Sequence, residues 1–131
     1  QVLMMRLKSD LLPILYATAT GTLDKVTAEW IDDTALTVVL ASKGYPAAYE
    51  KNTPIFAIPQ ADEGAKVFHA GTALKDGQLV ATGGRVLNVT ATGKTASEAQ
   101  RRAYDLLSKV EWDNGFCRKD IGWLAIAREQ G

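Results

Sequence analysis

The chain has 131 residues, of which 47% are hydrophobic and 23% are charged, and its 15 basic and 15 acidic residues give a formal net charge of zero. This balance is typical of a single soluble globular domain with a real core. The missing basic surplus argues against nonspecific nucleic-acid binding. One cysteine, Cys117, excludes an internal disulfide and favours a reducing compartment. The sequence also has no cysteine–histidine cluster for zinc, no membrane-spanning apolar run and no signal peptide.

The N-terminal segment predicts a helix that belongs to a separate unit. The chain enters an apolar stretch directly after Gln1, whereas natural N-termini are usually polar, so we expect a piece of a longer polypeptide. The apolar face of Ser9–Ala19 predicts a helix, and Gly21 is placed to end it. The composition then turns polar. We therefore expect residues 1–24 to be the helical end of a preceding domain and residues 25–131 to be the main domain.

The next segment predicts a strand followed by two loops. Ala35–Ala41 is short, apolar and rich in valine and leucine, which indicates a strand buried on both faces. It stops at Ser42–Pro46, a strong loop signal, and a second loop covers Tyr49–Thr53. Pro54–Pro59 is compatible only with an edge strand, because proline at each end limits pairing.

The middle of the chain predicts an antiparallel meander. Lys66–Lys75 and Gln78–Thr82 flank Asp76-Gly77, a pair typical of the type I′ turn of a hairpin. Gly83-Gly84 marks a tight turn or a bulge. Arg85–Ala91 then alternates Leu87, Val89 and Ala91 with Val86, Asn88 and Thr90, as a strand with two distinct faces does.

Thr95–Val110 is the clearest predicted helix. Thr95 and Glu98 fit a capping box, and apolar residues recur at helical spacing on one face. Opposite charges four residues apart predict ion pairs on the other face: Glu98–Arg102, Arg101–Asp105 and Asp105–Lys109. Trp123–Arg128 is short enough to be either a helix or a strand. Together these elements predict an α+β domain in which a helix packs on an antiparallel sheet.

Arg85 is the first candidate for a ligand contact. It follows a glycine pair, where a backbone can approach another group closely, and its guanidinium offers a planar fork suited to phosphate. The alternative is an ordinary surface arginine beside a turn that needs glycine. His69 is predicted to lie mid-strand among apolar neighbours, which favours a partly buried histidine over a catalytic one, since no nucleophile–base pair is evident around it. The Ser42–Pro46 loop suits a ligand loop and a plain turn equally well.

The sequence lacks the common nucleotide and metal motifs. It has no P-loop, no glycine-rich dinucleotide loop, no HExxH and no acidic cluster for Mg²⁺. The residues alone therefore predict an α+β domain with an anion site. A nonenzymatic module that binds an anionic metabolite or a protein partner stays open at this point.

Several segments match a known family in order along nearly the whole chain. They are QVLMMRLKSDLL, VVLASKGYPAAYEK, VFHAGTALKDGQLVATGGRVLNVTA, TASEAQRRAYDLL and FCRKDIGW. The chain resembles the C-terminal part of the glycinamide ribonucleotide synthetases, or phosphoribosylamine–glycine ligases, which are ATP-grasp enzymes. The end domain of another purine ATP-grasp enzyme is an alternative, but FHAGT together with GGRVL favours the glycine ligases.

The resemblance implies a cytoplasmic enzyme of de novo purine synthesis that joins glycine to 5-phosphoribosylamine with cleavage of ATP. It implies that the ATP-binding lysines and the Mg²⁺ carboxylates precede Gln1, so this chain would hold neither cofactor and would be inactive alone. Its partner would be the ATP-grasp domain of the same polypeptide. The chain would then be the small β-rich end domain of biotin-carboxylase-like ATP-grasp enzymes, which closes over the site.

Carried over by position, the resemblance also implies a substrate site without catalytic or metal-binding residues in this chain. Gly71, Thr72, Gly84 and Arg85 would lie near the ribose 5-phosphate, with Arg85 as the main charge contact. His69 and the loop residues Gly44, Tyr45 and Pro46 would border the same region. The sequence departs from the family at Asn52 and Asn88, where relatives often carry glycine, which puts the detailed loop shape in doubt.

Overall fold

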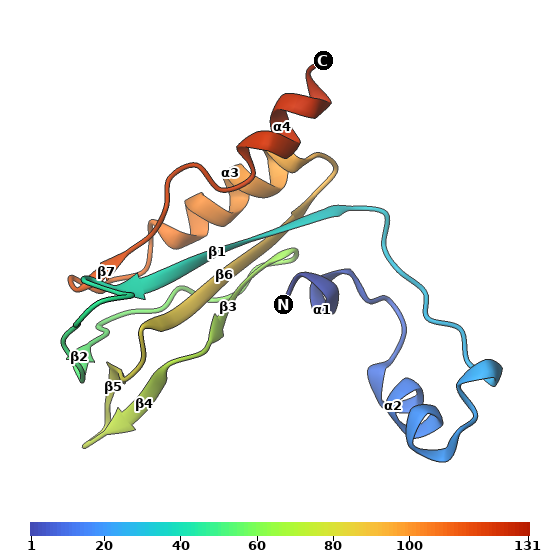
Figure 1. Cartoon of the computed structure of the whole chain (residues 1–131), viewed down its shortest axis with the longest axis horizontal. Coiled ribbons are helices and arrows are strands. Elements are labelled where there is room, and N and C mark those ends of the chain that lie inside the picture. The colour runs from blue at the N-terminus through green and yellow to red at the C-terminus, as the bar shows by residue number, and fades with distance from the viewer.

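The computed structural model describes all residues from Gln1 to Gly131, and its centre is a four-stranded antiparallel sheet with strand order β3-β6-β1-β7 (Figure 1). Its strands are β1 (Thr34–Ser42), β3 (Ala65–His69), β6 (Arg85–Gly93) and β7 (Gly115–Phe116). A three-stranded sheet adjoins it, with strand order β2-β5-β4. These strands are β2 (Thr53–Pro54), β4 (Thr72–Lys75) and β5 (Gln78–Ala81). The predicted α+β class with an antiparallel sheet and a packed helix is confirmed.

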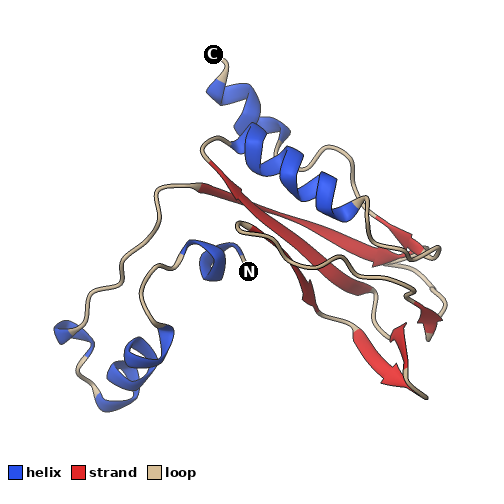
Figure 2. Cartoon of the chain, turned by 180° about the vertical axis from the view of Figure 1, so that it is seen from behind, coloured by secondary structure: helices blue, strands red, loops and turns tan.

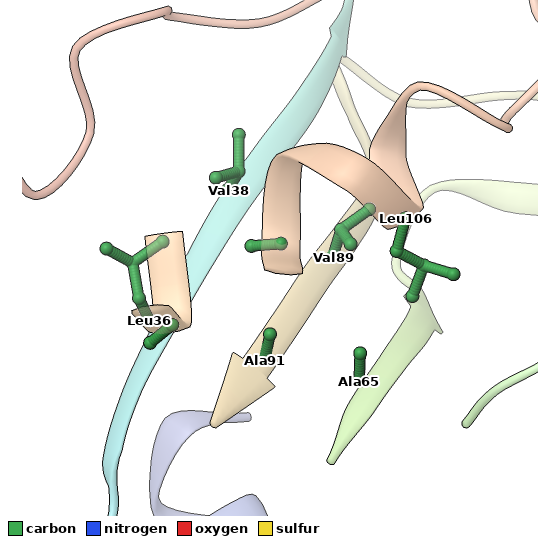
Figure 3. Close-up of a cluster of buried hydrophobic side chains, with 8 residues drawn as sticks. Leu36, Val38, Ala65, Val89, Ala91 and Leu106 are labelled. Atoms are coloured by element: carbon green, nitrogen blue, oxygen red, sulfur yellow. The ribbon is translucent and has the colours of Figure 1, made fainter. Parts of the chain in front are cut away.

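Helix α3 (Ala96–Leu107) covers one face of the four-stranded sheet. Small residues on the helix, Ala99 and Ala103, let it approach the strands closely, and Leu106 fills the space beside them. Figure 3 shows this core, to which β1, β3 and β6 each contribute apolar side chains. The strand residues are Leu36 and Val38, Ala65, and Val89 and Ala91.

Strand β1 is not buried on both faces, contrary to the prediction from its apolar run. Leu36 and Val38 are buried under α3 and Leu40 is buried in a second core, whereas Thr37 and Val39 on the opposite face are only half-buried. This alternation of buried and half-buried residues could not be seen in the sequence, because Val39 on the half-buried face is as apolar as the buried residues beside it. The face opposite α3 is therefore the one left open for a site.

The caps of α3 differ in one detail from the predicted capping box. The Thr95 hydroxyl accepts from the Glu98 N–H at 3.1 Å, as expected. The Glu98 carboxylate accepts from the Lys94 N–H and not from the Thr95 N–H. The segment predicted as either a helix or a strand is helix α4 (Trp123–Glu129). The carboxylate of Glu129, at its end, accepts a hydrogen bond from the Ala96 N–H of α3 at 2.6 Å.

The predicted hairpin turn is confirmed, but the strand before it is not continuous. Asp76 and Gly77 have positive φ of 49° and 80°, as a type I′ turn requires. The segment predicted as Lys66–Lys75 breaks at Ala70 and Gly71, because both N–H groups donate to the Val86 carbonyl. Its first part is β3 in the large sheet and its second part is β4 in the small sheet, so the expected single meander is wrong.

Two further expectations need correction. An edge strand was expected over Pro54–Pro59, but the strand that forms, β2, covers only Thr53–Pro54 and pairs with β5. The next residue, Ile55, is buried in the second core. That core includes Trp112, whose indole N–H donates to the Thr53 hydroxyl at 3.0 Å.

The ion pairs expected on α3 form only in part. Arg101 contacts Asp105 at 3.7 Å, while Arg102 turns to Asp62 and to backbone carbonyls instead of Glu98. The turn around Gly64 offers Arg102 several acceptors at once, which a single carboxylate on the same helix does not.

The N-terminal segment begins beside the sheet and then extends away from it, as Figure 2 shows. It consists of helix α1 (Val2–Arg6), helix α2 (Leu11–Thr20) and the 3-10 turn η1 (Leu23–Lys25). Helix α1 lies against β1 and β6, whereas α2 leaves Leu12, Leu15 and Tyr16 exposed. Gly21 ends α2 in the left-handed conformation, as predicted. No helix of the chain has the length and apolar character needed to cross a membrane.

Candidate functional site

Three segments meet at the start of β6. The Ser42 N–H donates to the Gly84 carbonyl, and the Ser42 hydroxyl donates to the Gly83 carbonyl, each at 2.8 Å. From the other side, the Thr82 N–H donates to the Gly71 carbonyl at 2.8 Å. The end of β1, the break after β3 and the glycine pair are therefore tied together by backbone groups.

The glycines at this junction allow the chain to approach itself. A Cβ on Gly71 would lie 2.6 Å from the Arg85 carbonyl oxygen, and a Cβ on Gly84 would overlap the Tyr45 ring. Contacts this short do not occur between real atoms, so both positions require glycine. The sequence correctly suggested a close approach, but what approaches is backbone and an aromatic ring of the same chain.

A bulge decides where Arg85 lies. Leu40 pairs with Leu87 and Ala41 pairs with Arg85, so Val86 is an extra residue on β6. In strict alternation Arg85 would share the α3 face with Leu87 and Val89. The extra residue instead brings Arg85 to the face that carries Val39 and Asn88.

On this face the structure has a hollow of about 470 Å³, which we name the Arg85 hollow. Its lining residues are Gln1, Thr37, Val39, Ala70, Gly71, Arg85 and Asn88. The Arg85 side chain is exposed and forms no ion pair or hydrogen bond with the rest of the chain. A free guanidinium at the edge of a hollow is suited to bind an anion such as phosphate.

The floor of the hollow is polar. The hydroxyls of Thr37 and Thr90 contact each other at 2.8 Å, so each has a partner inside the chain. The Asn88 side chain is only 9% exposed and makes no hydrogen bond to any other residue. Asn88 was predicted to share a strand face with Val86 and Thr90 and to depart from the family, but it was not predicted as a ligand contact. The available signal was a polar residue on the opposite face from Leu87 and Val89.

The other site residues expected from the sequence lie around the hollow, although they do not line it. Tyr45 packs on Gly84 and also contacts Tyr49 edge to face, with ring centroids 6.1 Å apart, and a cis peptide bond joins Tyr45 to Pro46. Gly44 has φ of 96° in the same exposed turn. His69 is exposed at the end of β3, not mid-strand and partly buried as expected. Its Nδ1 atom contacts the Thr72 hydroxyl at 2.9 Å.

The strongest ion pair near the C-terminus lies away from the hollow. Arg118 and Asp120 form a salt-bridged corner, with Arg118 Nε 2.9 Å from Asp120 Oδ1. Hydrogen bonding from Arg118 holds the pKa of Asp120 below its ordinary value. Burial raises the pKa of Tyr104, whose hydroxyl donates to the Arg118 carbonyl. These groups stabilise the path from β7 to α4.

Nowhere in the chain do three or more His, Cys, Asp or Glu side chains gather closely enough to hold a metal ion. The chemistry that the structure offers is recognition of an anion by Arg85, with neutral polar groups beside it.

The sheet, its covering helix and the hollow define a small α+β domain with a candidate anion site. The chain belongs to the family described as "Phosphoribosylglycinamide synthetase, C domain", which matches residues 35–124. The resemblance stated from the sequence motifs is thereby confirmed.

Relatives and a solved structure agree with this assignment. The chain is 82% identical over 130 residues to a phosphoribosylamine–glycine ligase of Agrobacterium fabrum and 68% identical over 129 residues to one of Rhizobium meliloti. These matches include 99% and 98% of this chain, but the chain spans only 31% and 30% of the length of the two relatives. The crystal structure of phosphoribosylamine–glycine ligase from Thermotoga maritima matches with a TM-score of 0.65 and 38% identity. That match covers 82% of this chain and 27% of the other.

Proposed function

We propose that this chain is the C-terminal domain of a phosphoribosylamine–glycine ligase, which joins glycine to 5-phosphoribosylamine with ATP in purine synthesis. The observation that carries the proposal is the 82% identity over 130 residues to a relative of that name. Such identity favours a ligase over a stand-alone binding module. It also favours the glycine ligase over other purine enzymes of the ATP-grasp group.

The groups of the ligase that bind ATP and Mg²⁺ would lie in polypeptide that precedes this domain. Residues 1–24 are then the end of the ATP-grasp domain and residues 25–131 the substrate-closing domain. In support, the family match starts at residue 35, and α2 exposes Leu12, Leu15 and Tyr16 as a surface for that polypeptide. ATP and Mg²⁺ would bind to that upstream part in the cytoplasm.

The role of this chain's own residues is to hold the phosphoribosyl substrate. Arg85 binds the 5-phosphate, and the bulge at Val86 keeps its guanidinium on the open face of the sheet. Gly71 and Thr72 border the phosphate, together with Gly84, His69 and the Gly44–Tyr45–Pro46 turn. Through its bonds to the Gly83 and Gly84 carbonyls, Ser42 fixes the backbone at the start of β6, and with it the position from which the Arg85 side chain extends into the hollow.

The test is Arg85→Ala in the complete enzyme. A charged hydrogen bond typically contributes about 1.5–3 kcal/mol, so we expect KM for phosphoribosylamine to rise by about 10- to 150-fold. KM for ATP should change less than twofold, since this charge does not contact the nucleotide. Steady-state kinetics with each substrate varied in turn give both values.

Arg101→Ala is the matched control. It removes the same guanidinium from an exposed position on α3, on the other side of the sheet, where Arg101 contacts only Asp105. We expect both KM values to stay at those of the wild type. An unchanged phosphoribosylamine dependence in Arg85→Ala would contradict the assignment of Arg85.

A further inference from the structure

Asn88 is the residue of the Arg85 hollow that the fold itself leaves without a partner. Its carboxamide has two N–H donors and one carbonyl acceptor, yet none of them bonds to another residue. Its neighbours across the sheet are Val39 on β1 and Phe68 on β3, which offer no side-chain hydrogen bond. The only buried side-chain N or O atom of the chain without a partner is Arg6 Nε, so the Asn88 amide is open to the hollow, where a ligand can bond to it.

The position of Asn88 relative to Arg85 suggests the shape of that ligand. Both residues line the same hollow and lie on one strand, three residues apart, which corresponds to about 10 Å along the backbone. The long arginine side chain can shorten this separation. The two groups therefore suit one small molecule with a charged end and a neutral polar end.

The chemistry of the two side chains differs in a useful way. A guanidinium only donates, which matches a phosphate. A carboxamide both donates and accepts, which matches hydroxyl groups. The hydroxyl of Thr37, which also lines the hollow, already bonds to the Thr90 hydroxyl and so competes less for a ligand.

We infer that the Asn88 carboxamide hydrogen-bonds a ring hydroxyl of a phosphorylated pentose whose phosphate is bound by Arg85. This inference rests on the proposed function and adds a specificity-determining residue to it. Arg85 selects the charge, and Asn88 selects the sugar. An unfilled amide also disfavours an apolar occupant, because its donors and acceptor would then be buried without partners.

The experiment compares two probes on the complete enzyme by calorimetry, ribose 5-phosphate and methyl phosphate, which lacks sugar hydroxyls. For Asn88→Leu, which keeps approximate volume but removes the amide, we expect Kd for ribose 5-phosphate to rise about 3- to 10-fold. Kd for methyl phosphate should stay unchanged. The thermal unfolding midpoint should stay close to that of the wild type, because the Asn88 amide bonds to no other residue of the chain. Arg85→Ala should weaken both probes.

Two further variants make the result decisive. Asn88→Ala removes the amide without adding a larger apolar group and should show the same selective loss. Asn114→Leu is the matched control, since it removes an amide outside the hollow that bonds to Glu50, and should leave both Kd values unchanged.

Three outcomes would overturn the inference. They are an unchanged Kd for ribose 5-phosphate in both Asn88 variants, an equal loss for both probes, and a loss explained by lower unfolding midpoints in both variants. Failure of the proposed function would look different. The wild-type enzyme would then lack phosphoribosylamine-dependent turnover, whatever the two Kd values show.

Discussion

The two faces of the four-stranded sheet are built from the same strands but have opposite characters. The face under α3 is packed with alanine, valine and leucine, and almost nothing polar reaches it. The opposite face carries Thr37, Thr90 and Asn88 and opens into the Arg85 hollow. Because side chains alternate along a strand, one stretch of sequence can specify a core and a site at once.

The difference shows how stability and recognition are separated in this domain. Residues that face α3 gain from burial and tight packing, whereas residues on the open face keep polar groups that packing alone would not favour. Substitutions on the first face should therefore lower the free energy of unfolding more than substitutions on the second face, where the site residues act on binding.

The largest expected effect is on the α3 face. Leu106→Ala removes a side chain that is 5% exposed and leaves a cavity between α3 and the sheet. We expect a loss of about 2–5 kcal/mol in the free energy of unfolding, measured by urea denaturation. Leu124→Ala on α4, where the residue is 53% exposed, makes the same chemical change and should stay within about 0.5 kcal/mol of the wild type. Equal losses would contradict the layered core.

An intermediate effect is expected at the rim of the open face. Gly84→Ala places a Cβ against the Tyr45 ring and should destabilise the chain by about 1–3 kcal/mol through overpacking. If the ring is the cause, Tyr45→Ala should be much less harmful in the Gly84→Ala background than in the wild type. Additive losses in a double-mutant cycle would show that the two residues act independently.

The smallest effect is expected for the hydroxyl pair on the open face. Thr90→Val leaves the Thr37 hydroxyl without its 2.8 Å partner and should lower the free energy of unfolding by about 1 kcal/mol. Replacing both threonines by valine should recover much of that loss, because no unpaired hydroxyl remains. Thermal unfolding of the two single variants and the double variant gives the comparison. A double variant less stable than either single variant would rule out this explanation.

Features with a local cause could be predicted from the sequence. Asp76-Gly77 requires positive φ, Gly21 ends a helix, and Thr95 caps one, so each was correctly placed from neighbouring residues alone. The antiparallel sheet and its packed helix followed from these elements.

Features that depend on distant partners could not be predicted. The break at Ala70 and Gly71 exists because both bond to Val86, 15 residues or more further along the chain. Arg102 was assigned to Glu98 on its own helix, but it bonds to carbonyls around Gly64 that periodicity does not reveal.

One of the two main residues of the candidate site, Arg85, could be predicted from the sequence, and the other, Asn88, could not. The glycine pair led to Arg85, but strict alternation places Arg85 on the α3 face, and only the extra residue Val86 corrects this. Asn88 went unnoticed as a contact because a polar residue on an alternating strand is usually solvated. Its burial depends on the pairing of β6 between β1 and β3.

The reach of Glu129 from α4 to the start of α3 has a consequence for where phosphate can bind. The N-terminus of a helix is a ready-made binding site for an anion. Here the carboxylate of Glu129 already occupies it, 2.6 Å from the Ala96 nitrogen. The start of α3 is therefore already occupied by a carboxylate of the same chain. The exposed guanidinium of Arg85, on the opposite side of the sheet, remains available to a charged metabolite.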